Sequence, residues 1–178
     1  LANDLGNLVN RTVSMSARYL GGDLPVPDAG APPPADTELR ERAGRAVTAY
    51  RAAIEQLHFS EALAAVMDLT TAANGYAESQ APWSLHKAGD VARTGAVLAV
   101  MAEACRLLGH LVAPFMPGAS RALLDQLGVP APHDERGAGG PRLDRLLAWG
   151  AGPSPWRSGS AVPLFPRVDV AEPEEVAR

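Results

Sequence analysis

Two short stretches of the chain combine side chains that can hydrogen-bond to nucleobases or stack on them. The first, residues 1–11, reads LANDLGNLVNR. Within it Asn7 and Arg11 are four residues apart, which is about one turn of a helix. A carboxamide and a guanidinium at this spacing can together hydrogen-bond base edges and a phosphate. The same residues also suit an ordinary solvent-facing side of a helix, and the pattern alone leaves both interpretations open.

The second stretch, residues 72–87, reads AANGYAESQAPWSLHK. Trp83 directly follows Pro82, and a proline ends a helix because the residue before it disfavours the α region. An indole fixed at such a corner can stack on an unpaired base, an interaction worth about 1–3 kcal/mol. Alternatively, Trp83 packs into one end of a helical bundle while Asn74 caps a neighbouring loop.

The sequence contains no recognisable catalytic or metal-binding pattern. The glycines at 137–140 run into Pro141 and are not followed by the lysine of a phosphate-binding loop. No serine lies in a Gly-x-Ser-x-Gly turn, and no two of the four histidines have metal-ligand spacing. Cys105, the single cysteine, falls on an apolar helical stripe, which is typical of a core thiol. We therefore expect no catalytic residue, metal ion or cofactor in this chain.

Composition predicts one globular, cytoplasmic domain. Of the 178 residues 47% are hydrophobic, and no apolar run approaches the roughly 18 residues of a membrane span. A lone cysteine fits a reducing compartment. The net charge of −4 argues against a general DNA or RNA binder. The last ten residues carry four acids and one base, however, so the rest of the chain is close to neutral and suits a small site that reads a few bases.

Helical periodicity in the opening segment predicts one helix with two different sides. The apolar stripe is Leu1, Leu5, Leu8, Thr12, Met15 and Tyr19, and the polar stripe is Asn3, Asn7, Arg11, Ser14 and Arg18. Gly21 and Gly22 end this helix. A proline-rich loop over 23–35 follows.

Capping and breaking residues predict four more helices. We expect Asp36 to cap the second and Ser60 the third, and Pro82 to stop the third. The fourth begins at Asp90, and the fifth runs from Pro117 to Gly128. After a Pro/Gly loop over 129–141, one or two helical turns fit 143–149, and residues 162–168 fit an extended strap.

These elements predict an all-α fold, a bundle of about five helices, with no paired strands. The predicted domain covers residues 1–168, and residues 169–178 form an acidic tail. The predicted stripes place neither carboxylates nor paired histidines in the bundle interior, which disfavours a small-ligand enzyme.

The two stretches, together with the terminal PLFPRVD, resemble the anticodon-binding domain of methionyl-tRNA synthetase, a class I aminoacyl-tRNA ligase. The resemblance implies that the chain recognises the CAU anticodon of a tRNA. It implies that Asn7, Arg11, Pro82 and Trp83 face the anticodon and bind the RNA. In this arrangement Trp83 stacks on or packs against the cytosine, and Asn7 and Arg11 read base edges and anchor the loop. Weaker candidates for contact or support are Asn10, Arg18, Asn74 and Lys87.

The resemblance also implies what lies outside the chain. The catalytic half, which binds ATP and methionine, is missing. We therefore expect an excised domain whose partners are the tRNA and its own catalytic domain, with a free-standing relative as the alternative. The strap over 163–167 would run back toward that domain. The alternative is a helical protein-interaction scaffold that retains the bundle without reading RNA.

Overall fold

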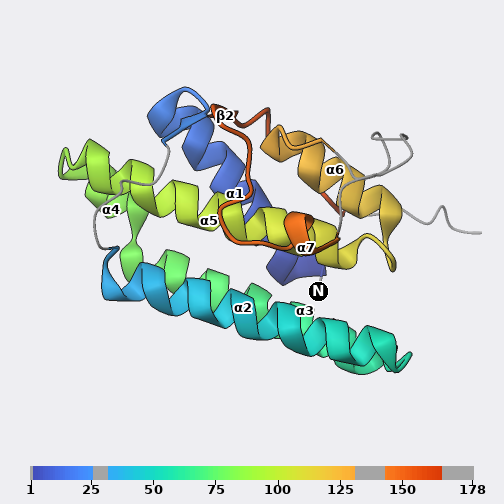
Figure 1. Ribbon diagram of the computed structural model, residues 1–178. Coiled ribbons are helices and arrows are strands. Elements are labelled where there is room, and N and C mark those ends of the chain that lie inside the picture. Colours follow the sequence, from blue (N-terminus) through green and yellow to red (C-terminus); the bar gives the residue numbers. More distant parts are fainter. Residues whose placement is uncertain (1, 26–31, 131–142, 166–178) are drawn as a thin grey trace, which may run out of the picture.

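The computed structural model describes residues 2–25, 32–130 and 143–165, and the fold is mostly helical (Figure 1). In chain order the elements are α1 (Ala2–Leu20), β1 (Asp23–Leu24), α2 (Pro34–Glu55), α3 (Phe59–Gln80), α4 (Pro82–Lys87), α5 (Val91–Val112), α6 (Pro117–Leu127), α7 (Leu143–Leu146) and β2 (Trp156–Arg157). The predicted all-α bundle is confirmed. The predicted acidic tail and the end of the strap lie outside the described residues.

Helix α5 is the centre of the bundle. Helices α2 and α3 form an antiparallel pair along one side of α5, and α1 and α6 also pack against α5 (Figure 1). By length and mean hydropathy α5 would qualify as a membrane span, but 94% of that apolar window is buried inside the protein. Burial on all sides by the other helices therefore accounts for its apolar character.

Several helix boundaries follow the predicted local chemistry. The Asp90 carboxylate accepts a hydrogen bond from the backbone N–H of Arg93 at 3.0 Å and so caps α5. Pro117 begins α6, and Gly128 ends it with a φ of 70° that glycine adopts without steric cost. Two predicted caps are wrong. Helix α2 begins at Pro34, so Asp36 lies inside its first turn, and α3 begins at Phe59 after His58, so Ser60 is inside that helix.

The prediction that Pro82 only stops a helix is incomplete. Pro82 ends α3 but is also the first residue of α4, a position where its missing N–H costs nothing. The predicted absence of strand pairs is also wrong. Leu24 and Asp23 pair antiparallel with Trp156 and Arg157. This ladder joins the end of α1 to the C-terminal segment.

The apolar side of α1 faces the core and its polar side faces outward, as predicted, and the buried face is wider than predicted. Leu5, Leu8 and Thr12 are fully buried, and so is Val13. Gly6 lies under the strap, because a Cβ added there would come within 3.3 Å of the Phe165 ring. The polar stripe of α1 is thus left facing outward.

Candidate nucleic-acid interface

The interface begins on the outward side of α1. Asn7 and Asn10 are exposed and Arg11 is half-buried, while the apolar residues between them pack inward. Asn7 and Arg11 lie on the same side of the helix because they are four residues apart. Asn10 is three residues after Asn7 and so also neighbours it, but it lies about 100° around the helix from Arg11.

A sharp corner between α3 and α4 presents the indole. Ala81 adopts the left-handed conformation, with φ 43° and ψ 61°, which costs a non-glycine residue on the order of 1–2 kcal/mol. The corner is fixed by two backbone hydrogen bonds, from Ala81 N to Ala77 O and from Ser84 N to Ala81 O. Pro82 is buried, and the next residue, Trp83, is 36% exposed. Trp83 is therefore not fully buried in the end of the bundle, and part of the residue faces solvent.

The structure brings Arg11 of α1 and Trp83 of α4 together. The Arg11 guanidinium carbon lies 5.2 Å from the centroid of the Trp83 ring, within the range of a cation–π contact. Arg11 also donates to the Glu78 carboxylate at 2.7 Å. Both partners of this ion pair are substantially exposed, so it contributes little to folding stability. Its main effect is to hold the guanidinium beside the ring.

Sequence reasoning did not identify Glu78. It lies four residues after Asn74 on α3, so a helical projection from Asn74 would have placed it on the same side. Asn74 itself links two helices, since its amide donates to Asp4 O at 3.2 Å and to Thr70 O at 3.1 Å. Among the weaker candidates, Lys87 is exposed at the end of α4, and the Arg18 guanidinium lies over the Tyr19 ring.

A network of charged and polar side chains holds the residue that precedes the corner between α3 and α4. Arg93 makes two 2.6 Å hydrogen bonds to the Asp36 carboxylate and donates to the side chain of Gln80 at 2.7 Å. Tyr76 donates its hydroxyl to Asp36 at 2.7 Å. Gln80 immediately precedes Ala81, so the network ties the start of α2 and the start of α5 to the residue before the corner.

The network also shifts the pKa values of its members. Burial alone would raise the pKa of Asp36, but the hydrogen bonds from Arg93 and Tyr76 outweigh it and hold that pKa below its usual value. Burial and the bond to Asp36 raise the pKa of Tyr76. The Asp36 carboxylate therefore stays ionised inside the protein, paired with a guanidinium.

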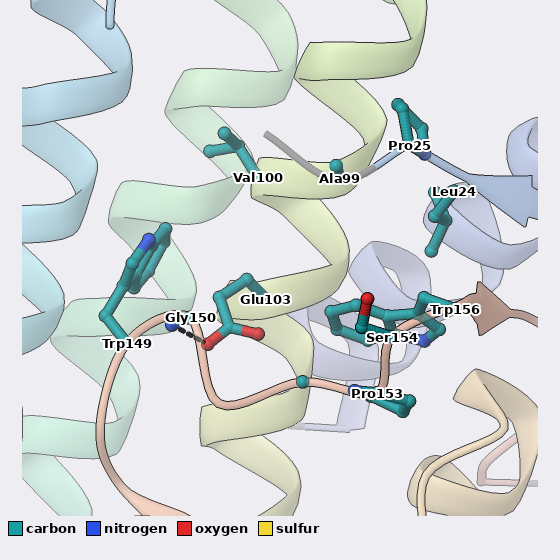
Figure 2. Close-up of a pocket in the computed structure, with 11 residues that line it drawn as sticks. Leu24, Pro25, Ala99, Val100, Glu103, Trp149, Gly150, Pro153, Ser154 and Trp156 are labelled. Atoms are coloured by element: carbon teal, nitrogen blue, oxygen red, sulfur yellow. Dashed lines mark hydrogen bonds between the residues drawn. The ribbon is translucent and has the colours of Figure 1, made fainter. Parts of the chain in front are cut away.

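A second buried carboxylate contradicts the expectation from the helical stripes. Glu103 of α5 is 5% exposed and is bound by Arg106 at 2.7 and 2.9 Å. It also accepts the backbone N–H of Gly150 at 2.5 Å, beside a small apolar cavity of about 100 Å³ lined by Trp149 and Trp156 (Figure 2). The helical stripes did not indicate Glu103, because α5 is buried on all sides and not along one stripe. These bonds give Glu103 a structural role: they fasten the C-terminal segment to α5.

Cys105 is a core thiol, as predicted. It is fully buried, its sulfur lies 3.7 Å from the Thr12 hydroxyl, and burial raises its pKa to about 12. Within the described part of the chain, no three His, Cys, Asp or Glu residues gather in a way that could hold a metal ion.

Comparison with known proteins gives a consistent set of similarities. The family model described as the anticodon binding domain of methionyl tRNA ligase matches residues 26–138. A methionine–tRNA ligase of Thermosynechococcus vestitus is 34% identical over 170 residues, which cover 94% of this chain and 32% of that protein. One of Brucella suis is 43% identical over 131 residues, covering 74% and 25%.

Solved structures agree. The free methionyl-tRNA synthetase of Mycobacterium tuberculosis superposes with a TM-score of 0.75 at 30% identity, covering 96% of this chain and 33% of that one. Its complex with methionyl-adenylate gives a TM-score of 0.76 at 32% identity, covering 93% and 31%. The chain thus spans a third or less of the length of these relatives. Because the family model covers more than half of the sequence, the chain belongs to the family of anticodon-binding domains of methionyl-tRNA ligase.

Proposed function

We propose that this chain recognises the CAU anticodon of a methionine tRNA. In this role it gives specificity to ATP-dependent attachment of methionine to the tRNA, a reaction carried out in the cytoplasm by a catalytic part that lies outside the chain. ATP and methionine bind that part, and this chain contributes no catalytic residue.

The observation that carries the proposal is the partly exposed indole of Trp83 with the guanidinium of Arg11 beside it. Specific recognition of single-stranded RNA relies on unstacked bases held on aromatic rings and hydrogen-bonded at their edges. Trp83 supplies the ring, and Arg11 and Asn7 supply donors and an acceptor on the neighbouring helix. We assign stacking on the first anticodon base to Trp83 and edge or phosphate contacts to Asn7 and Arg11.

Support for the fixed position of Trp83 comes from its surroundings. Pro82 is buried, and the Asp36–Arg93–Gln80 network holds the residue before the corner. A platform that is already rigid loses little conformational entropy when a base stacks on it. We assign positioning roles to Pro82 and Asn74, and supplementary RNA contacts to Asn10, Arg18 and Lys87.

The strap has a separate role in this proposal. Phe165 packs on Gly6 of α1, the same helix that carries Asn7 and Arg11. We assign to the strap the joining of the interface to the catalytic part, so that anticodon binding and the reacting end of the tRNA keep a fixed relationship.

The test is equilibrium binding of the chain to two RNA stem-loops that differ only in the anticodon, CAU or the same bases in scrambled order, at low salt. We expect clear preference for CAU. Equal affinity for both loops, measured with folded protein, would overturn the proposal and favour a protein-interaction scaffold.

A further inference from the structure

A second cluster of aromatic and basic side chains joins the same two helices that carry Arg11 and Trp83. The rings of Tyr19 on α1 and His86 on α4 stack with centroids 4.0 Å apart and an angle of 16° between their planes. The Arg18 guanidinium carbon lies 5.9 Å from the centroid of the Tyr19 ring. His86 and Arg18 are exposed and Tyr19 is half-buried. We call Arg18, Tyr19 and His86 the second stack.

The second stack continues along α1 and α4 from the contact between Arg11 and Trp83. Arg18 follows Arg11 by seven residues, which is about two helical turns, or about 10 Å along α1 on nearly the same side. His86 follows Trp83 by three residues, so these two side chains are neighbours on α4. Each site therefore repeats one arrangement, in which an arginine from α1 lies beside an aromatic ring at the junction with α4.

The charge at this junction differs from that of the whole chain. After Asp4, the charged residues of α1 and α4 are all basic, namely Arg11, Arg18 and Lys87, although the net charge of the chain is −4. Glu78 of α3, the acid that contacts Arg11, forms an ion pair with it. Cations interleaved with aromatic rings are the pattern that proteins use to follow a single-stranded nucleic acid backbone.

We propose that the second stack is an additional RNA subsite, which holds the sugar-phosphate backbone of a loop nucleotide next to the base on Trp83. This inference rests on the proposed function. The Arg18 guanidinium and the imidazole N–H of His86 donate to a phosphate, and the ring of His86, backed by Tyr19, supports the adjacent ribose or base. The cluster has no carboxamide, and phosphate contacts fix position without reporting sequence. It therefore adds affinity without adding preference for an anticodon.

A purely structural role predicts something different. If the Tyr19–His86 contact serves only to clamp α4 onto α1, then loosening it disturbs Trp83, and preference for CAU falls together with affinity. If it is an RNA subsite, affinity falls equally for every loop and the preference is unchanged. These two signatures can be separated in one set of titrations.

The experiment uses Arg18→Gln, His86→Ala and His86→Phe, each titrated with the CAU and scrambled stem-loops over a series of salt concentrations. We expect Arg18→Gln and His86→Ala to weaken binding to both loops by the same factor, about fivefold or more for His86→Ala. The salt dependence of Arg18→Gln should become shallower by about 0.7 in the slope of log K against log salt, as for one lost phosphate contact. His86→Phe retains the ring and should fall between His86→Ala and the unsubstituted chain.

Matched controls come from α2 and from the turn between α2 and α3, which carry none of the residues of the second stack. Arg42 is an exposed arginine that pairs with Asp68, and His58 is an exposed histidine before α3. Arg42→Gln and His58→Ala should leave binding to both loops unchanged. Thermal unfolding is measured for every variant, to check that the variant is folded at the temperature of the titration.

Each outcome decides between the proposals. Unchanged affinity in Arg18→Gln and His86→Ala, with CAU still preferred, overturns the subsite and leaves the proposed function standing. A parallel loss of affinity and of CAU preference also overturns it, in favour of the clamp. If the unsubstituted chain binds both loops equally but these variants bind more weakly, the subsite stands and the proposed function fails. Absence of binding to either loop overturns both.

Discussion

The guanidinium of Arg11 contacts both the indole of Trp83 and the carboxylate of Glu78. Its carbon lies 5.2 Å from the ring centroid, and its Nη1 lies 2.7 Å from Oε1 of the carboxylate. These three residues come from α1, α4 and α3, so their meeting depends on how the helices pack. Arg11 is therefore already oriented beside the ring before any RNA binds. The negative charge of Glu78 lies next to the Arg11 guanidinium.

The charge of Glu78 gives the first prediction. Its side chain is 62% exposed and contacts Arg11, to which we assign an edge or phosphate contact. Removing one negative charge about 6 Å from a phosphate, at the dielectric constant of water, is worth about 0.7 kcal/mol. Glu78→Gln should therefore raise the affinity for the stem-loop about threefold at low salt and less at high salt.

The control for this change is Asp68→Asn, which removes an equivalent exposed carboxylate ten residues earlier on α3, where it pairs with Arg42 of α2. It should have a much smaller effect on RNA binding. A fall in affinity on Glu78→Gln would show instead that orientation of Arg11 by the carboxylate matters more than repulsion.

The Asp36–Arg93 pair gives a prediction for stability. Arg93→Met leaves the Asp36 carboxylate, whose side chain is 8% exposed, without its guanidinium and should lower the free energy of unfolding by about 3 kcal/mol. The double variant Asp36→Leu/Arg93→Met removes both charges and should be more stable than Arg93→Met alone. Urea unfolding of Arg93→Met, of Asp36→Leu and of the double variant measures the energetic coupling between the two residues. Additive losses would show that the pair does not act as a unit.

The same network links stability to the interface. Because Arg93 binds Gln80 directly before the corner, Arg93→Met should also weaken CAU binding under conditions where the variant is folded. Arg42→Met, at an exposed ion pair remote from the corner, should change neither quantity appreciably.

His110 predicts a dependence of stability on pH. It is 5% exposed, its Nδ1 has no hydrogen-bond partner among the described residues, and burial together with the charge of Arg106 lowers its pKa to about 4. Between that value and the unfolded pKa of about 6.5 the unfolded chain binds the additional proton. Stability is therefore complete above pH 6.5 and falls as the pH is lowered toward 4, by on the order of 3 kcal/mol.

Urea unfolding at pH 7 and pH 4.5 measures this loss. His110→Phe should remove most of it, whereas His58→Ala, at an exposed histidine, should retain it. If the pH dependence of His110→Phe equals that of the unsubstituted chain, His110 is not responsible.

Two glycines give opposite predictions for the same substitution. A Cβ added at Gly109 of α5 would lie 2.8 Å from a Leu124 methyl and 2.9 Å from a Leu123 methyl on α6. Gly109→Ala should therefore destabilise the protein by about 1–3 kcal/mol through overpacking. Gly44 of α2 has nothing within 4 Å, so Gly44→Ala should stabilise the protein by about 0.4–1 kcal/mol. Thermal unfolding distinguishes the two, and stabilisation by Gly109→Ala would contradict the close approach of α5 and α6.

The sequence predicted those features that depend on local chemistry. Asp90 as a cap, Pro117 at a helix start and Gly128 at a helix end each act within one turn of the chain, so periodicity and residue type were sufficient. Asp36 has the residue type of a cap, but its carboxylate instead meets Arg93, 57 residues away. No local pattern could have revealed that partner.

The features that were missed depend on long-range packing. The strands β1 and β2 have two residues each and no periodicity, and they pair only because the segment after α1 meets the segment after α7. Asn7, Arg11, Pro82 and Trp83 could be selected from the sequence, and the structure places Arg11 beside Trp83. Glu78, Tyr19 and His86 have ordinary helical contexts, so their proximity to these residues emerged only from the packing of α1, α3 and α4.

The most direct test of the central claim is the ratio of affinities for CAU and scrambled stem-loops, measured for the unsubstituted chain and for Trp83→Ala. Phe59→Ala, at an aromatic residue 52% exposed on the remote end of α3, serves as the matched control. We predict that Trp83→Ala remains folded and loses about 1–3 kcal/mol of CAU binding, so that the ratio falls toward one, while Phe59→Ala retains the ratio. A folded Trp83→Ala variant that still prefers CAU as strongly as the unsubstituted chain would contradict the account.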